Sequence, residues 1–335
     1  MKSVAVVILN WNGASLLSEF LPSVCRYTSP DVADVIVADN GSTDHSFQLL
    51  EHDFPQVGII RFSQNHGFAE GYNQAVKQLT DYRYIVLLNS DVAVSEGWLE
   101  PLWDYAEAHP EVGVLQPKIR SYRNPSQFEY AGACGGFLDC NGYPFCRGRI
   151  FDTVEEDNGQ YDDVTDIFWA SGAALFIRRD VYVAVGGLDA DFFAHMEEID
   201  LCWRVRLAGY AVRVVPMSVV YHLGGATLDN SNPYKLYLNF RNNLLMMYKN
   251  LPVREGRRAL FIRRLYDTMA LFRYLLTGKF ACVKAVWLAH VDFRSMRSMY
   301  TAQPAENILK AIPVCRHNIV WDYFIKHIRQ FSELK

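Results

Sequence analysis

Short β-branched runs alternate with amphipathic segments over the first ninety residues, and this alternation restricts the chain to few folds. The run from Val4 to Asn10 is strand-like, and apolar residues at helical spacing follow it. The same pattern recurs after the runs 35–38 and 57–62, and a fourth apolar run covers 84–88. Strands separated by helices predict an α/β fold, with a mostly parallel, Rossmann-like sheet flanked by helices.

Clusters of Asn, Asp and Gly follow each of the four strand-like runs. Ligands of open α/β sheets bind beyond the carboxyl ends of the strands, so these clusters are predicted to meet at one edge. One cluster would indicate only a turn, because these are the usual turn residues, but four in succession indicate a binding site. The clusters are Asn10 with Asn12, the stretch Asp39–Asp44, the stretch Asn65–Gly67 and the tripeptide Asn89–Asp91.

Asp91 is the first candidate for a metal ligand. Mg²⁺ and Mn²⁺ prefer oxygen ligands and commonly take only one or two protein carboxylates, while a substrate diphosphate supplies other oxygens. His222 follows a strand-like run and can complete such a site. Alternatives stay open, because Asp91 can close an Asx turn and a lone histidine is more often structural.

Two adjacent acids, Glu197 and Glu198, open a predicted helix that ends near Gly209. Helical spacing places Glu198 on the apolar face of this helix, directed toward the sheet, while Asp200 can pair with Arg204. An inward acid at a helix start can act as a general base. The alternative is that these acids only complement the helix dipole.

The domain organisation is predicted to be one elaborated domain with a helical C-terminal extension. Residues 1–245 carry the motifs, and 118–166 form a loop-rich insertion. With 335 residues, half of them apolar, the chain can bury a sizeable core. Its seven dispersed cysteines favour reduced thiols and a cytoplasmic location over a disulfide framework.

The C-terminal region 246–335 is predicted to be helical, basic and amphipathic. Residues 249–300 contain eleven Lys or Arg against three Asp or Glu, a local charge of +8. Such a segment can lie on an anionic membrane surface, or its apolar face can pack on the catalytic domain or on a second subunit of a homodimer. We expect neither a signal peptide nor a spanning helix, and no nucleic-acid partner.

Taken together, these motifs resemble the family 2 inverting glycosyltransferases of the GT-A fold, especially a bacterial branch of rhamnosyltransferases. The resemblance covers about residues 3–245. The matching segments are 6–13 (VVILNWNG), 37–44 (VADNGSTD), 65–73 (NHGFAEGYN), 87–91 (LLNSD), 171–174 (SGAA), 197–204 (EEIDLCWR), His222 and 241–242 (RN).

The resemblance implies transfer of a sugar, with inversion, from a nucleoside-diphosphate donor to a glycan or lipid-linked acceptor in cell-surface polysaccharide synthesis. Asp39 would read the base, while Asp91 and His222 would hold Mg²⁺ or Mn²⁺ beneath the diphosphate. The second acid of the helix-start pair would be the base. This is Glu198, although the family more often has Asp there, so Glu197 stays a candidate.

The same resemblance implies a donor site built from several strand ends and loops. The leading donor is dTDP-L-rhamnose, followed by UDP-sugars. Arg241 offers a guanidinium suited to a diphosphate or an acidic acceptor group, against the alternative of a helix-surface arginine. The other residues predicted to line the donor site are Asn10, Asn12, Asn65, Gly67, Asn73 and Asn89.

Two other function classes would share the α/β sheet or the sugar-nucleotide site. A sugar-phosphate nucleotidyltransferase would carry a Gly-rich, basic phosphate loop after the first strand, and residues 10–13 do not form one. A non-catalytic scaffold that binds sugar nucleotides or glycans is the stronger alternative. The joint presence of Asp91, Glu198 and His222 favours an enzyme.

Overall fold

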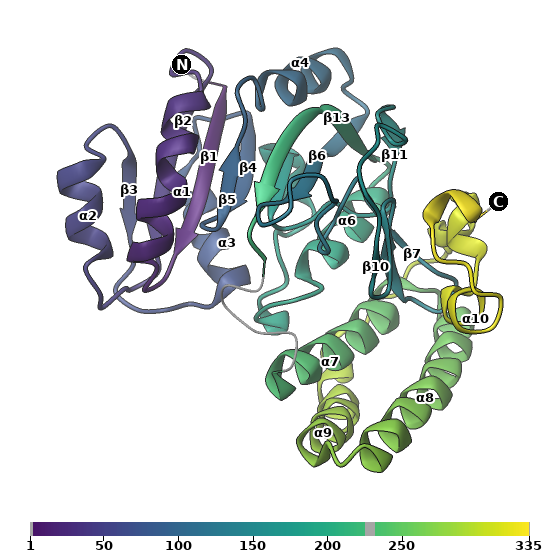
Figure 1. The fold of residues 1–335 in the computed structure, drawn as a ribbon. Helices are drawn as coiled ribbons and strands as arrows, with labels where there is room; N and C mark the ends of the chain where they lie inside the picture. Colours follow the sequence, from purple (N-terminus) through teal and green to yellow (C-terminus); the bar gives the residue numbers. More distant parts are fainter. Residues whose placement is uncertain (1–2, 225–231, 335) are drawn as a thin grey trace.

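The structure, a computed structural model, describes residues 3–224 and 232–334. Its described part is built around a nine-stranded sheet in the order β11-β13-β6-β12-β4-β1-β2-β3, with β5 paired to β13 (Figure 1). The strands of this sheet are β1 (Val4–Asn10), β2 (Ala33–Asp39), β3 (Gly58–Arg61), β4 (Tyr84–Asn89), β5 (Val92–Val94), β6 (Val112–Ser121), β11 (Thr165–Asp166), β12 (Ala174–Arg178) and β13 (Ala211–His222).

The predicted sheet direction is confirmed. β1 pairs in parallel with β2 and β4, and β2 with β3. β12 is antiparallel to both β4 and β6, which therefore run the same way, and β13 is parallel to β6. The helices are α1 (Ala14–Tyr27), α2 (Ser46–Asp53), α3 (Phe68–Gln78), α4 (Glu100–Ala108), α5 (Arg179–Ala184), α6 (Glu197–Leu207), α7 (Pro233–Asn250), α8 (Val253–Leu276), α9 (Phe280–Met296) and α10 (Ile319–Phe324).

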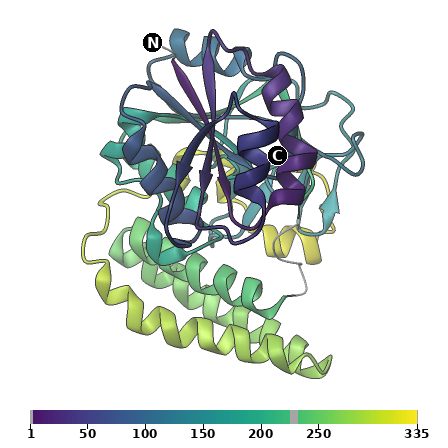
Figure 2. The same cartoon turned by 90° about the vertical axis from the view of Figure 1, so that its left-hand side faces the viewer.

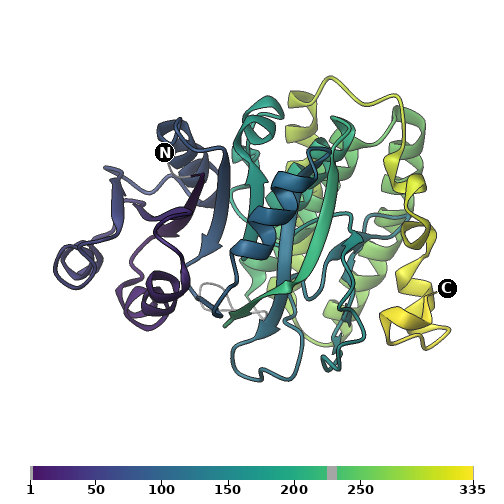
Figure 3. The same ribbon diagram turned by 90° about the horizontal axis from the view of Figure 1, so that it is seen from above.

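Apolar layers cover both faces of the sheet. Side chains alternate between the faces along a strand, so Ala5 and Val7 of β1 enter one layer while Val6 and Ile8 enter the other. α3 and α6 pack in the first layer, and α1 and α4 in the second (Figure 3). A sheet covered on both faces leaves its strand ends as the natural place for a polar site.

The region from 118 to 166 is more regular than predicted. The predicted start of the insertion falls inside β6, which continues to Ser121 because it stays paired with β13 as far as His222. Beyond it, a small antiparallel sheet has the order β10-β9-β8-β7. Its strands are β7 (Gly136–Leu138), β8 (Pro144–Cys146), β9 (Arg149–Ile150) and β10 (Thr153–Val154).

The C-terminal helices α7, α8 and α9 lie beyond the edge at which β1 and β13 end (Figures 1 and 2). The predicted boundary at residue 245 lies inside α7, so the helical extension begins at Pro233. The final segment returns to the small sheet, where Phe331 packs on Phe137 and the Ile319 amide donates to Asp139 Oδ2 at 3.0 Å. Among the described residues, no helix is long and apolar enough to cross a bilayer.

Candidate active site

The ends of β1, β2 and β4 bring the predicted polar clusters to one edge of the sheet. Asn10 lies opposite Asp39 in the register of β1 and β2, and Asn89 ends the neighbouring β4. The buried Asn10 side chain donates to Asp39 Oδ1 and to Ser42 Oγ, each at 3.2 Å. The first of these bonds orients the Asp39 carboxylate.

Asn12 joins the first two clusters. Its backbone is left-handed (φ 51°), and its Oδ1 accepts from the Thr43 amide at 2.7 Å and from the Asp44 amide at 3.3 Å. The loop after β1 is thereby tied to the loop after β2. A cavity of about 480 Å³ opens beside this junction, beyond the ends of β2 and β3. Its lining residues are Gly41, Ser42, Thr43, Arg61, Phe62 and Ser63.

Asn65 and Gly67 shape the loop before α3. Asn65 Oδ1 accepts from Asn40 Nδ2 at 3.0 Å and from the Gly67 amide at 2.7 Å. Gly67 has φ 79°, and a Cβ added to it would lie 3.0 Å from the Phe193 ring. Glycine is therefore required here, because the loop packs directly against the segment that precedes α6.

Asp91 and His222 come together through the pairing of β5 with β13. His222 lies opposite Val92, and the Leu223 amide donates to the Asp91 carbonyl at 3.0 Å. Asp91 Oδ1 is then 3.2 Å from His222 Nε2, with both side chains almost fully buried. The two predicted metal ligands are neighbours.

The Asp91 and His222 pair fits a hard divalent cation. Adjacent ligand atoms of an octahedral Mg²⁺ at about 2.1 Å lie roughly 3 Å apart, close to the observed Oδ1 to Nε2 separation. Carboxylate and imidazole also suit Mn²⁺. Over residues 3–224 and 232–334, no cluster of three or more His, Cys, Asp or Glu side chains is arranged for a metal.

Glu197 and Glu198 begin α6 next to the loop before β12. Glu197 is buried and Glu198 is half-buried, with its Cβ 3.7 Å from the position of a Cβ built on Gly172. In the described part of the chain, neither Oε2 atom has a hydrogen-bond partner. Burial raises the pKa of Glu198 to about 7. Burial and the adjacent Glu198 carboxylate raise the pKa of Glu197 well above its ordinary value.

Asp200, by contrast, is a structural acid. It accepts from Arg204 Nε at 2.7 Å, as predicted, and from Lys249 Nζ at 2.9 Å. Burial opposes ionisation, but these two cations hold the pKa of Asp200 below its ordinary value. The ion pair with Lys249 fastens α6 to α7. Within the described residues, Glu197 and Glu198 form no ion pair of this kind.

A family model described as Glycosyl transferase family 2 matches residues 5–183, which include β1 to β4, Asp39 and Asp91. This chain belongs to glycosyl transferase family 2. The matched range ends before α6, so the helix-start acids of this glycosyltransferase come from the part of the chain that follows it.

Two curated relatives of this glycosyltransferase are rhamnosyltransferases. The chain is 28% identical to the N-acetylglucosaminyl-diphospho-decaprenol L-rhamnosyltransferase of Mycobacterium tuberculosis, over 65% of this chain and 75% of the relative. It is 26% identical to rhamnosyltransferase WbbL of Escherichia coli, over 56% of this chain and 72% of the relative.

Solved structures of similar shape confirm the GT-A fold. GalNAc-T7 with UDP, GalNAc and Mn²⁺ superposes with a TM-score of 0.58 at 16% identity, over 76% of this chain and 49% of that one. This glycosyltransferase therefore spans about half the length of that protein. The mannosyltransferase PcManGT of Pyrobaculum calidifontis, with GDP-Man and Mn²⁺, gives 0.53 at 13% identity, over 88% and 75%.

Glu129 is a residue of this glycosyltransferase that the sequence analysis missed. It lies in the predicted loop-rich insertion, where no motif marks it, and its amide donates to the Ile119 carbonyl of β6. This places the buried Glu129 Oε2 3.4 Å from His222 Nδ1. Burial alone would lower the pKa of His222, but Asp91 and Glu129 raise it to about 10.

The segment before α6 is strained. Phe193, His195 and Met196 all have positive φ, at 65°, 68° and 72°. Such conformations persist only where the surroundings impose them, and they concentrate at functional sites. Here the buried Asn242 side chain donates to three carbonyls of this turn. The sequence analysis names Asn242 only as part of the 241–242 motif and predicts no role for its side chain. The three acceptors are the carbonyls of Phe192 (2.9 Å), Ala194 (2.9 Å) and His195 (2.7 Å).

Arg241 supports the same turn. Its guanidinium donates at 3.0 Å to the Asp191 and Phe192 carbonyls, and its Nε donates to Asn242 Oδ1 at 2.9 Å. It is buried on α7, so the alternative of a helix-surface arginine is wrong. Two of these bonds direct the guanidinium at backbone carbonyls, and a diphosphate that bound Arg241 there would have to displace them.

Asn73 is engaged in a similar way. Its Oδ1 accepts from Tyr182 Oη at 2.7 Å and from the Leu188 amide at 3.0 Å, and its Nδ2 donates to the Leu188 carbonyl at 2.8 Å. Asn73 thus links α3 to the segment after α5. The prediction that Asn73 lines the donor site rests on the resemblance alone, because none of these bonds points to a donor site.

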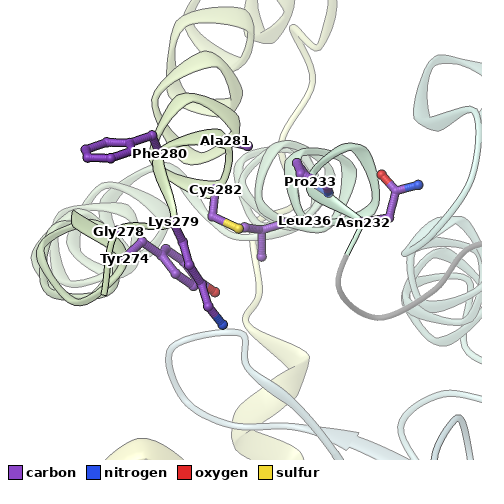
Figure 4. A pocket seen from close by; sticks show the side chains of 9 residues that line it. All are labelled: Asn232, Pro233, Leu236, Tyr274, Gly278, Lys279, Phe280, Ala281 and Cys282. Carbon is purple, nitrogen blue, oxygen red and sulfur yellow. The ribbon is translucent and has the colours of Figure 1, made fainter. Parts of the chain in front are cut away.

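A second cavity, of about 530 Å³, lies between the start of α7 and the turn that joins α8 to α9 (Figure 4). None of the predicted donor or metal residues lines it. Most of its lining residues are apolar, and Asn232, Tyr274 and Lys279 are the polar ones. The lining residues are Asn232, Pro233, Leu236, Tyr274, Gly278, Lys279, Phe280, Ala281 and Cys282.

Proposed function

We propose that this glycosyltransferase inverts the anomeric centre, requires Mn²⁺ or Mg²⁺, and takes its sugar from a nucleoside-diphosphate donor. The observation that carries the proposal is the chemistry of the edge: a carboxylate and imidazole pair, Asp91 with His222, and a separate acid, Glu198, whose pKa is raised to about 7. One group of residues suits a departing diphosphate, and the other suits an attacking hydroxyl.

Glu198 would act as the general base. A base works best when its pKa is near the operating pH, because it is then largely ionised and still basic enough to accept a proton. As the acceptor oxygen forms its bond to the anomeric carbon, Glu198 takes the hydroxyl proton and the bond to the diphosphate oxygen breaks. In this single displacement one bond to the anomeric carbon forms as the other breaks, so the configuration at that carbon inverts.

Asp91 and His222 would hold the divalent cation. A bound cation of this kind stabilises the negative charge that grows on the departing diphosphate. Glu129 would orient the imidazole from its other nitrogen, as carboxylates commonly do for metal-bound histidines. At the far end of the donor, Asp39 and the 480 Å³ cavity beside the 41–43 loop would receive the base.

dTDP-L-rhamnose is the proposed first donor, with UDP-sugars next. The donor is supported by the similarity to two proteins named rhamnosyltransferases. The name of the mycobacterial relative also contains a diphospho-decaprenol, which supports a lipid-linked glycan as acceptor. We therefore place the proposed reaction in cell-surface polysaccharide synthesis, at the cytoplasmic face of the inner membrane.

The test is release of nucleoside diphosphate from a panel of dTDP- and UDP-sugars, with Mn²⁺, with Mg²⁺ and with EDTA. The wild type is compared with Asp91→Ala and Glu198→Gln, and with Asp31→Asn, an exposed acid just before β2. Release with one donor that needs the metal and both site residues supports the proposal. Donor binding without release, also in the presence of lipid-linked acceptors and equal in all variants, would overturn it in favour of a binding scaffold.

A further inference from the structure

α8 carries a second apolar face that nothing in the described structure covers. Its inner face, with Ala259, Leu260, Arg263 and Asp267, is buried. The opposite face holds five large apolar side chains at intervals of three or four residues, which places them in one stripe along the helix. The stripe and its exposed fractions are Phe261 (60%), Leu265 (54%), Met269 (67%), Phe272 (57%) and Leu276 (87%).

α9 continues this apolar surface. Phe280, Trp287 and Val291 are 68%, 59% and 40% exposed, and their spacing also places them on one face. The residues buried on α9 lie elsewhere around the helix, toward α7 and α8. Figures 1 and 2 show α8 and α9 on the side of α7 that is remote from the sheet. We call the exposed sides of α8 and α9, including the turn between them, the α8–α9 face.

The charge around the α8–α9 face is almost entirely positive. The acids of this region are occupied: Glu255 binds Lys310 at 2.7 Å, Asp292 accepts from the Tyr237 hydroxyl at 2.6 Å, and the buried Asp267 pairs with Arg263. Within the described ranges, the exposed cations form no ion pair. These cations are Arg254, Arg257, Arg258, Arg264, Arg273, Lys279, Lys284, Arg294 and Arg297.

We propose that the α8–α9 face docks on an anionic lipid bilayer, with α8 and α9 lying in the plane of the interface. Aromatic and aliphatic side chains that project between unpaired arginines and lysines match the two layers of that surface: acyl chains below and acidic headgroups above. A second copy of the chain is the poorer occupant, because a self-complementary contact would bring these cations against their own equivalents.

This inference deepens the proposed function, because it names the surface that would deliver a lipid-linked acceptor, but its test needs no catalysis. The helices of the face lie beyond the edge that carries Asp91, His222 and Glu198 (Figure 1). The 530 Å³ cavity opens at the α8–α9 turn, where Phe280 and Lys279 belong both to the cavity wall and to the face (Figure 4). Docking would therefore place the turn and its cavity at the lipid surface.

The experiment is sedimentation of the full chain with vesicles of phosphatidylcholine, with and without phosphatidylglycerol, at low and high salt. Two double variants, Phe272→Ser with Leu276→Ser and Arg257→Gln with Arg258→Gln, are compared with the wild type. Met217→Ser and Lys77→Gln are the matched controls, since both side chains are exposed on other elements. Circular dichroism and the oligomeric state of each protein are measured in parallel.

We expect the wild type and both controls to bind only the anionic vesicles and to be released by salt. Each double variant should lose about tenfold or more in partitioning, with unchanged circular dichroism. Absence of binding to anionic vesicles, or equal binding by all variants, would overturn the proposal. A dimer that the apolar variant dissociates would assign the face to a second copy instead. Since donor turnover is not measured, failure here leaves the proposed reaction unaffected.

Discussion

Asp91 Oδ1 lies 3.2 Å from His222 Nε2, and this contact is built by the backbone. The antiparallel pairing of β5 with β13 sets His222 opposite Val92, one residue after Asp91. Both side chains are thus held in place before any ligand binds, which is how a site keeps the ordering cost of binding low.

Removal of either member of the pair should weaken metal binding. We expect Asp91→Ala and His222→Ala to lower the affinity for Mn²⁺, in the presence of a nucleoside diphosphate, by more than the roughly 10- to 100-fold that loss of an outer-shell partner costs. Isothermal titration calorimetry measures this directly. If both variants bind Mn²⁺ with the wild-type affinity, the metal site does not lie at this edge of the sheet.

Glu129→Gln should give a smaller effect of the same kind. Its carboxylate contacts His222 Nδ1 at 3.4 Å, so its loss frees the imidazole to rotate, and we expect a decrease in Mn²⁺ affinity of about 10-fold to 100-fold. Glu156→Gln is the matched control, because Glu156 is an exposed acid of the same region. Equal affinities in the two variants would show that Glu129 does not position the histidine.

Glu198→Gln should abolish most transfer without weakening donor binding. A general base contributes about 10² to 10⁴ in rate, and the wild-type rate should fall as the pH drops below about 7, where Glu198 becomes protonated. The pH profile of kcat/KM and the affinity for the donor are measured together. A larger loss in Glu197→Gln than in Glu198→Gln would transfer the role to Glu197.

The same substitution should stabilise the fold at alkaline pH. The folded-state pKa of Glu198 is raised from 4.5 to about 7, so between these values the folded protein binds more protons than the unfolded chain, and stability falls as the pH rises. Glu198→Gln removes that loss. We expect its Tm to exceed the wild-type Tm at pH 8 and the difference to shrink at pH 4.5, as measured by calorimetry. A Tm below that of the wild type at pH 8 would contradict this.

Asn242→Ala should disturb the positions of Glu197 and Glu198 by loosening the turn that precedes α6. It removes the donor to three carbonyls of a turn with positive φ, and loss of a buried partner costs about 1–3 kcal/mol. We expect a lower Tm and a decrease in kcat with little change in metal affinity. Asn243→Ala is the control, since this buried neighbour donates to the Gly142 carbonyl rather than to the turn. If both variants lose kcat equally, the turn has no special role.

The sequence by itself determined the part of the sheet from β1 to β4 and the edge that carries the candidate site. Strand period, helix period and polar residues at strand ends are local patterns, and parallel strands align their carboxyl ends. Asp39, Asp91 and the acids of α6 could therefore be named in advance as candidate site residues. The pairing of Asp200 with Arg204 was predictable for the same reason, because four residues along a helix bring side chains together.

Tertiary structure alone decided the partners of these residues. Glu129 reaches His222 because its segment lies beside β6, and Arg241 and Asn242 face a strained turn because α7 packs under it. The second apolar stripe of α8 could be recognised as exposed only once the first was seen to be buried. Contacts between residues far apart in the chain depend on how helices and strands pack against one another. The periodicity of side chains within one helix or strand does not determine that packing.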